Sequence, residues 1–253
     1  MLILDRQNKV LQYVKKHRVA TVATLAKHFD VHEATIRRDL SLLEKRGKLK
    51  RTHGGGMVED EVHSEPPFGE RESAQFAEKQ RIGKKAASFV ESGDNIILDS
   101  GSTTLHIARA IKDKEDITVI TNDVNIAAEL RFSENIKVIV TGGVLFHESY
   151  MLNGMITDDV LKKVHVNIAF IATPAFHHQF GLTHFDEQLV PAKRGMIKAG
   201  KRVIVVTDHT KIDRVSLHQV APISEIDTII TTDELDEASK ESLKNTDVDV
   251  CFI

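Results

Sequence analysis

The chain has 253 residues, of which 41% are hydrophobic and 28% charged, so it can bury a sizeable core as one large domain or two. Its single cysteine, Cys251, excludes an internal disulfide and a cysteine-based zinc site. No apolar run approaches the ~20 residues that a membrane helix needs. The N-terminal residues lack the basic-then-apolar layout of a secretion signal. We therefore expect a cytoplasmic protein without a membrane partner.

Charge is distributed unevenly along the chain. Residues 1–56 hold 13 Lys and Arg against 5 Asp and Glu, a net charge of +8. Residues 57–253 hold 21 against 32, a net charge of −11, and the two parts together give the overall −3. A small basic segment on an acidic body is typical of a protein whose basic part meets a polyanion. The alternative is that the segregation has no functional meaning.

Three short helices are predicted in the basic segment. Apolar residues recur at helical spacing over residues 4–14 and 22–29. A third helix is predicted over 33–46 and stops at Gly47; its apolar stripe consists of Ile36, Leu40 and Leu43. The basic stretch 48–53, followed by three glycines, predicts a small β-wing.

The third helix is predicted to enter the DNA major groove, where arginine can form two hydrogen bonds to guanine. Cations on the wing would contact phosphates. The residues expected to contact DNA are Thr35, Arg37, Arg38, Ser41, Lys45, Lys48, Lys50, Arg51 and His53. A basic helical cap without a DNA-binding role is the alternative. DNA binding is favoured because a helix pair, an Arg-Arg pair, a glycine stop and a basic wing occur together.

Residues 34–56, ATIRRDLSLLEKRGKLKRTHGGG, resemble the winged helix-turn-helix signature of DeoR-type bacterial sugar-operon repressors. The matching positions are Thr35, Ile36, Arg37, Arg38, Asp39, Leu40, Leu43, Gly47, Leu49, Arg51, His53, Gly54 and Gly55. One departure is His32, where the family usually has the serine that caps the helix; serine accepts a backbone N–H bond more readily than histidine. The resemblance implies a bacterial regulator that binds double-stranded operator DNA and associates with the nucleoid when bound.

Residues 57–75 are predicted to link a DNA-binding domain, 1–56, to an effector-binding and oligomerisation domain, 76–253. The linker is acidic and polar, contains Pro66-Pro67 and offers little to bury. After it, apolar strands alternate with amphipathic helices at least six times. That alternation predicts an α/β domain with an open, mostly parallel sheet.

The segment LDSGSTT, residues 98–104, lies between a predicted strand and a predicted helix. Free N–H groups and the positive end of the helix dipole attract an anion there, and the hydroxyls add donors. The segment lacks the Gly-Lys-Ser/Thr ending of a nucleotide-binding loop and the GxSxG elbow of a nucleophilic serine. It predicts a phosphate-binding loop, with a merely well-capped helix start as the alternative.

Small polar residues follow three more predicted strands, at Thr121-Asn122, Thr141-Gly142-Gly143 and Thr207-Asp208. Ligands of open α/β sheets bind beyond the carboxyl ends of the strands, so these segments should share one edge with LDSGSTT. Lys193 and Lys211 could add positive charge, although either alone is typical of a surface lysine. The residues expected around the effector are Asp99, Ser100, Gly101, Ser102, Thr103, Thr104, Thr121, Asn122, Gly142, Gly143 and Lys211.

The body also resembles the DeoR-type effector domain, whose fold is similar to that of ribose-5-phosphate isomerase. Matching features are DSGSTT, the Thr-Asn and Thr-Gly-Gly strand ends, Gly-Leu-Thr at 181–183, KRGMI at 193–197 and Asp-His-Thr-Lys at 208–211. The resemblance implies that the DSGSTT loop binds a phosphorylated sugar, that this ligand alters operator affinity, and that Lys211 lies near it. One departure is Ala172-Thr173-Pro174-Ala175, where the family usually has two glycines and an acidic residue in a turn that borders the pocket.

Three histidines and two acids cluster in a predicted loop: His177, His178, His184, Asp186 and Glu187. Their spacing matches no zinc pattern, so we expect a polar loop, no metal and no cofactor.

The favoured function is a transcriptional regulator rather than an enzyme. We expect a homo-oligomeric repressor of a carbohydrate-catabolism operon, because such heads read DNA as symmetric pairs. The alternative is a sugar-phosphate isomerase-like enzyme that carries a helical DNA-binding cap, with Asp99, Glu187 and Lys211 as candidate bases. An architectural DNA-bending protein fits less well because it gives the α/β body no role.

Overall fold

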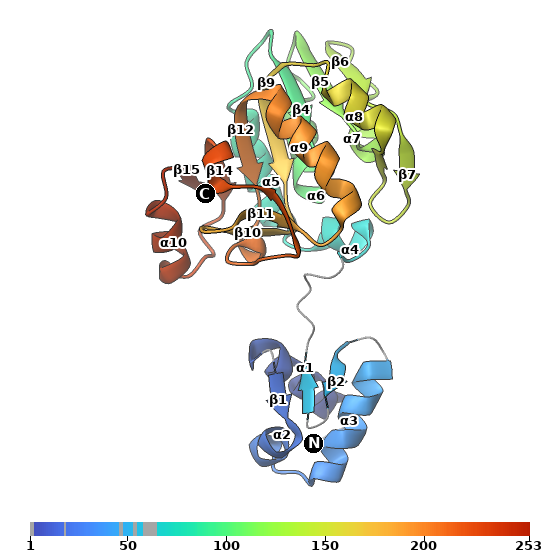
Figure 1. Ribbon diagram of the computed structural model, residues 1–253, viewed down its shortest axis with the longest axis vertical. Helices are drawn as coiled ribbons and strands as arrows, with labels where there is room; N and C mark the ends of the chain where they lie inside the picture. The colour runs from blue at the N-terminus through green and yellow to red at the C-terminus, as the bar shows by residue number, and fades with distance from the viewer. Residues whose placement is uncertain (1–2, 18, 46–47, 53–54, 58–64) are drawn as a thin grey trace. The chain divides into compact units, whose positions relative to one another are not determined.

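The computed structural model describes residues 3–17, 19–45, 48–52, 55–57 and 65–253 (Figure 1). It divides the chain into two compact units, Met1–His63 and Ser64–Ile253, here named the head and the body. No helix among the described residues is both long enough and apolar enough to cross a membrane.

The head packs three helices against a small antiparallel sheet. The helices are α1 (Ile3–His17), α2 (Val22–Phe29) and α3 (Glu33–Lys45). The strands lie in the order β1 (Val19–Thr21), β3 (Gly55–Met57) and β2 (Lys50–Thr52). The apolar stripe of α3 faces the core, where Ile36 and Leu40 are fully buried. The head is the predicted winged helix-turn-helix, with β2 and β3 as the wing.

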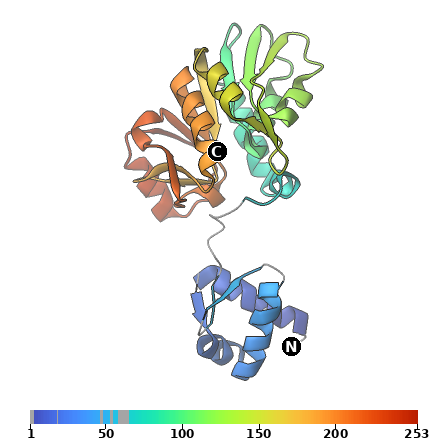
Figure 2. The same cartoon turned by 45° about the vertical axis from the view of Figure 1, so that its right-hand side comes forward.

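Seven parallel strands form the centre of the body (Figures 1 and 2). In chain order they are β4 (Asn95–Leu98), β5 (Ile117–Thr121), β6 (Ile136–Val140), β9 (Val166–Ala172), β12 (Gly200–Val206), β14 (Thr228–Thr231) and β15 (Asp249–Phe252). Their order across the sheet is β15-β14-β12-β9-β4-β5-β6, and each neighbouring pair is parallel. The predicted α/β domain is confirmed.

Helices cover both faces of this sheet, which explains why the central strands are apolar at nearly every position. One face is covered by α5 (Phe76–Ala87), α6 (Ser102–Ile111) and α7 (Val124–Leu130). The other face is covered by α8 (Met155–Leu161), α9 (Val190–Ala199) and α10 (Glu237–Lys244). Strand β9 serves both cores, because Phe170 points into the first while Ala169 and Ile171 point into the second.

The second half of the segment 57–75, expected to be a linker, differs from that expectation. Residues Phe68–Ser73 form α4, and the Phe68 ring is buried in the core beneath α5 and α6. The Phe68 N–H donates to the Glu148 carbonyl at 3.2 Å, which ties α4 to the body. The acidic composition of the segment gave no indication that one aromatic residue, Phe68, is buried.

Two small sheets arise from segments that the sequence left as loops or turns. Strands β7 (Val144–Phe146) and β8 (Met151–Asn153) form a hairpin. Strands β10 (Ala175–His177), β11 (Gly181–His184) and β13 (His218–Ala221) form an antiparallel sheet. Strands of three or four residues contain too few positions for an alternating pattern to stand out.

Candidate functional site

The strand order reverses between β4 and β9 at the centre of the sheet. From β4 the chain builds β5 and β6 toward one side, and from β9 it builds β12, β14 and β15 toward the other. All carboxyl ends lie at one edge because every strand is parallel. Ligands of open α/β sheets bind at such a reversal. The segments 99–104 and 172–175 follow the two strands that flank it.

A buried ion pair joins these two segments. The Lys193 ammonium, on α9, donates to the Asp99 carboxylate and to the Ala172 carbonyl, the latter at 2.9 Å. The Ala172 N–H donates to the same carboxylate at 3.1 Å. Asp99 is 1% exposed and Lys193 4% exposed, so the interpretation of Lys193 as a surface lysine is wrong. Burial raises the pKa of Asp99, and the Lys193 charge together with the backbone N–H bonds opposes that rise.

The loop after β4 presents the N-terminus of α6 at the reversal. The Gly101 carbonyl accepts the first helical bond from the Leu105 N–H at 3.0 Å and the Thr104 hydroxyl at 2.9 Å. The N–H groups of the first helical turn have no partner within a helix. Ser102 and Thr103 lie on that first turn and are almost fully buried. The loop therefore places a helix N-terminus at the strand-order reversal.

Gly101 is required by close packing. A β-carbon at this position would lie 2.8 Å from the Ala172 side chain, a contact that real β-carbons do not make. The turn 172–175, which departs from the family pattern, is therefore in close contact with the DSGSTT loop. Within that turn, the Thr173 hydroxyl donates to the Ala175 carbonyl at 2.8 Å, and both residues are buried.

The end of β5 supports the loop from its other side. The Thr121 hydroxyl donates to the Leu98 carbonyl at 2.7 Å, so this fully buried threonine positions the backbone. Asp123, which no sequence motif indicated, accepts a hydrogen bond from the Ser100 hydroxyl at 2.8 Å and caps α7 through the N–H groups of residues 125 and 126. The signal available for it was an acidic residue directly before a helix. The Asn122 amide donates to the Leu152 carbonyl at 3.1 Å, while its buried oxygen has no partner among the described residues.

The two glycines after β6 have a conformational explanation. Gly142 and Gly143 both have positive φ, 77° and 123°. A β-carbon on Gly143 would lie 2.6 Å from the Asn153 carbonyl oxygen. The Thr157 hydroxyl donates to the Gly142 carbonyl at 2.6 Å. The glycines therefore shape the turn into β7 at the shared edge.

Lysines and acids lie together near the end of β12. Lys211 is half-buried on the short 3-10 helix His209–Lys211, which Asp208 caps through the Thr210 N–H at 3.0 Å. The buried Lys79 ammonium on α5 donates to the carbonyls of Arg71 and Ala74. Burial lowers the pKa of Lys79, Asp208 opposes that effect and Lys211 adds to it.

His184, in contrast to the expected polar loop, is a core residue. It lies in β11, and its Nδ1 accepts the Asp186 N–H at 3.0 Å. Burial, with a smaller contribution from Lys193, lowers its pKa to about 3. His184 is therefore neutral at pH 7 and supports the turn before α9.

In the head, α3 presents its predicted cations to solvent. Arg38, Lys45 and Lys48 are exposed, and Thr35 and Ser41 are half-exposed. Arg37 pairs with Glu33 one helical turn earlier, whereas no partner for the Arg38 guanidinium is found among the described residues. The side chains of Lys50 and Arg51, on β2, and the whole of His53 lie outside the described residues.

Asp39, matched only as part of the family signature, fixes the position of α3. Its buried carboxylate accepts two hydrogen bonds from Arg6, at 2.6 and 3.2 Å, and one from Gln7 at 3.2 Å. Both donors lie on α1. The histidine that departs from the family also has a role, because the Ala34 N–H donates to His32 Nδ1 at 3.2 Å and caps α3.

A winged helix-turn-helix head joined to an α/β body with a polar switch point defines a two-domain DNA-binding regulator. The family described as the DeoR-like helix-turn-helix domain matches residues 6–62, and the DeoR C terminal sensor domain matches residues 74–233. The chain belongs to the DeoR family of transcriptional regulators.

Relatives align with this chain along nearly its whole length. A protein of Bacillus subtilis named the HTH-type transcriptional regulator YulB is 37% identical over 100% of this chain and 98% of its own length. GolR of Listeria innocua, also named an HTH-type transcriptional regulator, is 32% identical over 94% of each chain. A putative aga operon transcriptional repressor of Escherichia coli O157:H7 is 30% identical over 98% of this chain and 93% of its own. All three carry the names of transcriptional regulators.

Solved structures with a similar chain course include ribose 5-phosphate isomerase A from Neisseria gonorrhoeae. It is 16% identical, with a TM-score of 0.40, over 55% of this chain and 53% of that chain. A likeness of this degree has no bearing on ligand or reaction.

Replacing Lys193 with methionine should destabilise the body, because the Asp99 carboxylate would remain buried without its cation. Removal of one partner of a buried pair typically costs ~3–5 kcal/mol. Urea unfolding of the full chain, followed on the transition of the body, measures the effect. Lys198→Met is the matched control, since Lys198 is exposed on the same helix. Adding Asp99→Asn to Lys193→Met should recover part of the loss, and wild-type stability of Lys193→Met alone would contradict the role of the pair.

Proposed function

We propose that this regulator represses a carbohydrate-catabolism operon and that a phosphorylated sugar, bound at the strand-order reversal of the body, controls its affinity for the operator. The observation that carries the proposal is the DSGSTT loop. This loop directs the free N–H groups at the start of α6 toward the strand-order reversal of the parallel sheet.

The phosphate is assigned to the N-terminus of α6, with the hydroxyls of Ser102 and Thr103 as further donors. The sugar hydroxyls are assigned to the ends of the neighbouring strands. Asn122 supports this assignment, because its buried amide oxygen has no partner among the described residues and can accept a hydroxyl. Lys211 adds positive charge from the end of β12. Thr104 and Thr121 are positioning residues, since their hydroxyls are bonded to backbone carbonyls.

The isomerase alternative is disfavoured by the state of its two carboxylate candidates, Asp99 and Glu187. Asp99 is almost fully buried and bonded to Lys193, so its carboxylate is not free to take a proton from a substrate. Glu187 is exposed at the start of a short 3-10 helix. A general base needs a position within hydrogen-bond reach of the proton that it removes. We therefore assign the body to sensing, in a cytoplasmic protein that joins the nucleoid when bound to DNA.

Operator binding is assigned to the exposed face of α3. Ala34, Arg38, Ser41 and Lys45 follow one another at helical spacing on this face, opposite Ile36 and Leu40. Arg38 is the residue proposed to bind a base, because its guanidinium has no competing partner among the described residues. Lys48 and the wing are assigned to phosphates.

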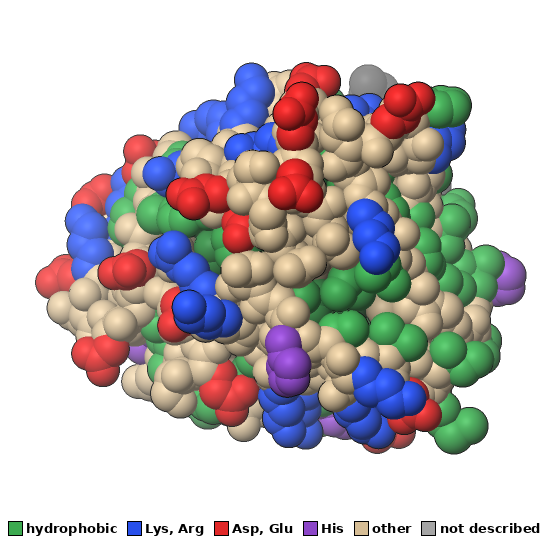
Figure 3. All heavy atoms as spheres, turned by 90° about the horizontal axis from the view of Figure 1, so that it is seen from above, with side chains coloured by type: hydrophobic (Ala, Val, Ile, Leu, Met, Phe, Trp, Pro, Cys, Tyr) green, Lys and Arg blue, Asp and Glu red, His purple; other side chains and the backbone are tan. Residues whose placement is uncertain are grey.

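Repression through paired half-sites requires a second copy of the chain. The surface proposed to hold it is the β6–α8 patch, defined as Val140, Val144, Leu145, Met155 and Ile156. These apolar side chains are exposed, Met155 by 84% and Val144 by 69%. In Figure 3, which views the molecule from above, hydrophobic side chains gather toward the right of the picture. Strand β6 is also an edge strand of the sheet, and an open apolar edge is a site for pairing with another chain.

A phosphorylated sugar should stabilise the body, whereas its parent sugar should not. A ligand present at 100 times its Kd stabilises the folded state by ~2.7 kcal/mol. Thermal unfolding against a panel of sugar phosphates, each beside its unphosphorylated sugar, measures this difference. Ser102→Glu should abolish the shift by placing a negative charge at the anion site. Ser92→Glu, an exposed serine before β4, is the matched control. A shift that survives in Ser102→Glu would contradict the assigned position.

Arg38→Ala should weaken operator binding by ~1–3 kcal/mol, the value of a lost base contact. The operator is first selected from a random duplex pool with the wild-type chain, and affinity is then measured by fluorescence anisotropy at fixed salt. Lys162→Ala removes the same charge from an exposed site on the body and should leave affinity unchanged. Equal affinity of Arg38→Ala and wild type would remove Arg38 from the recognition surface.

Placing two aspartates on the β6–α8 patch should dissociate the oligomer. Met155→Asp with Ile156→Asp is compatible with the helix, because acidic residues are favourable in the first turn. Sedimentation velocity should give at least a dimer for wild type and a monomer for the variant. Leu217→Asp alters an apolar residue of similar exposure elsewhere and should retain the wild-type mass. An unchanged mass in the double variant would move the interface to another surface.

A further inference from the structure

Three potential metal ligands converge where the β10–β11 hairpin meets the segment after His209–Lys211. His177 ends β10, His178 follows it in the turn, and Asp213 comes from a segment 35 residues further along the chain. One ligand atom from each residue lies within 4.8 Å of the others. It is the one such group among the described residues.

Backbone hydrogen bonding brings Asp213 to the histidines. Phe176 and Ile212 form a parallel β-bridge, and the Arg214 N–H donates to the Phe176 carbonyl at 3.1 Å. These contacts align the residue after Phe176 with the residue after Ile212. Asp213 adopts a left-handed conformation, φ 58°, at this point. The arrangement is therefore part of the fold and does not depend on a chance meeting of long side chains.

The spacing of the polar atoms fits a shared cation better than a hydrogen bond. His178 Nδ1 lies 3.7 Å from the Asp213 carboxylate, beyond hydrogen-bond reach. The same Nδ1 is buried and has no hydrogen-bond partner among the described residues. Two ligands at ~2.1 Å from a tetrahedral zinc ion are about 3.4 Å apart. The observed gap is thus close to that between two ligands of one metal ion.

The two imidazole rings of this group lie against each other. They stack with centroids 4.3 Å apart. His177 Nδ1 accepts the N–H of the exposed Gln179 at 3.1 Å. A metal ion bound to Nδ1 would replace that bond, since a neutral imidazole has one in-plane lone pair.

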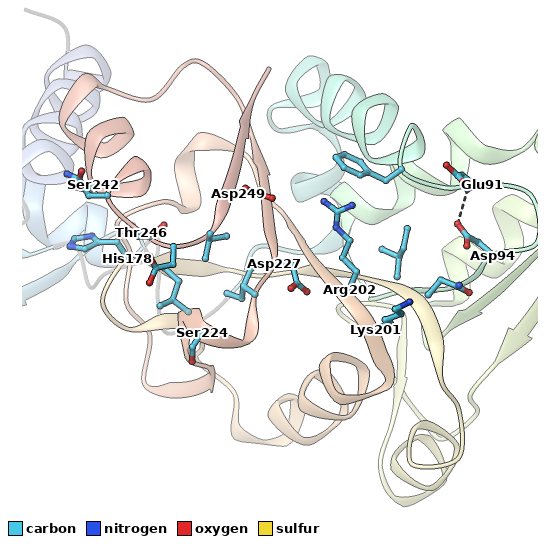
Figure 4. Close-up of a pocket in the computed structure, with 18 residues that line it drawn as sticks. Glu91, Asp94, His178, Lys201, Arg202, Ser224, Asp227, Ser242, Thr246 and Asp249 are labelled. Carbon is cyan, nitrogen blue, oxygen red and sulfur yellow. Dashed lines mark hydrogen bonds between the residues drawn. The ribbon is translucent and has the colours of Figure 1, made fainter.

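One member of the cluster, His178, also lines a large groove that extends to the amino ends of β4 and β15. The groove has a volume of about 1270 Å³, and His178 and Thr246 line it together. Figure 4 shows His178 at one end of the groove and Glu91 and Asp94 at the other. A fourth ligand position can therefore be filled by water from the groove.

We propose that His177, His178 and Asp213 bind a divalent transition-metal ion of the zinc class, with water as the fourth ligand. Two imidazoles and one carboxylate select zinc and its neighbours over magnesium and calcium, which prefer oxygen ligands. The bound ion joins the hairpin to the segment that leads into β13. The proposal does not depend on the sugar-phosphate assignment, since the two sites share no residue.

The untagged full-length chain, freed of metal by chelation and dialysis, is titrated with Zn²⁺ by calorimetry, and its zinc content is measured after gel filtration. Wild type should bind one ion per chain, and Mg²⁺ should not compete. His178→Gln and Asp213→Asn should each weaken zinc binding at least ~10-fold, as the loss of groups at metal sites commonly does. His165→Gln, an exposed histidine before β9, is the matched control.

Folding and binding are separated by two further measurements. Asp213 is 36% exposed, so Asp213→Asn should keep the wild-type unfolding temperature of the metal-free protein. Cobalt substitution should give the intense visible absorption of a tetrahedral site in wild type and lose it in the two ligand variants. Absence of zinc uptake by wild type, or equal uptake by wild type, His178→Gln and Asp213→Asn, would overturn the proposal.

Discussion

The buried pair of Asp99 and Lys193 is the contact on which the organisation of the body depends. It joins the end of β4, the end of β9 and the helix α9, which are separated by up to 94 residues. Taking two charges out of water is costly and is offset only when the remaining polar groups are also bonded. Here the Ala172 N–H and carbonyl complete the set. The loop that leads into α6 is thereby held against β9 before any ligand arrives, and a site fixed in advance loses less entropy on binding.

The head also contains a buried carboxylate that fixes a helix to the core. The Asp39 carboxylate, buried between α1 and α3, accepts bonds from Arg6 and Gln7. The preceding residue, Arg38, is exposed. Asp39 therefore anchors α3, while Arg38 presents a cation to solvent. In both units a buried acid on or beside the functional element fixes that element to the core. The difference is the partner, a partly exposed arginine in the head and a buried lysine in the body.

The sequence was sufficient for features that are local or that follow from topology. The apolar stripe of α3, the alternation of strands and helices, and the meeting of strand ends at one edge were all predicted, because periodicity and parallel pairing determine them. Features that depend on one residue meeting a distant one were not. Lys193 looks like any helical lysine until the fold places Asp99 beside it. Phe68 lies among acidic residues whose composition predicts a linker. Nothing in the sequence indicates that Asp213 lies beside His177.

The magnitudes restrict how a ligand can signal from this site. Coupling between two sites in such regulators is typically ~1–3 kcal/mol, and a ligand shifts an equilibrium only by its difference in affinity for the two states. Breaking a buried ion pair costs ~3–5 kcal/mol, which exceeds that amount. Under the proposed function, the Asp99–Lys193 pair is therefore expected to stay intact when the effector binds and leaves. A contact between exposed apolar surfaces, such as the one proposed for the β6–α8 patch, can change at a cost within this range. If the chain assembles as proposed, we expect the effector to act on that contact rather than on the buried pair.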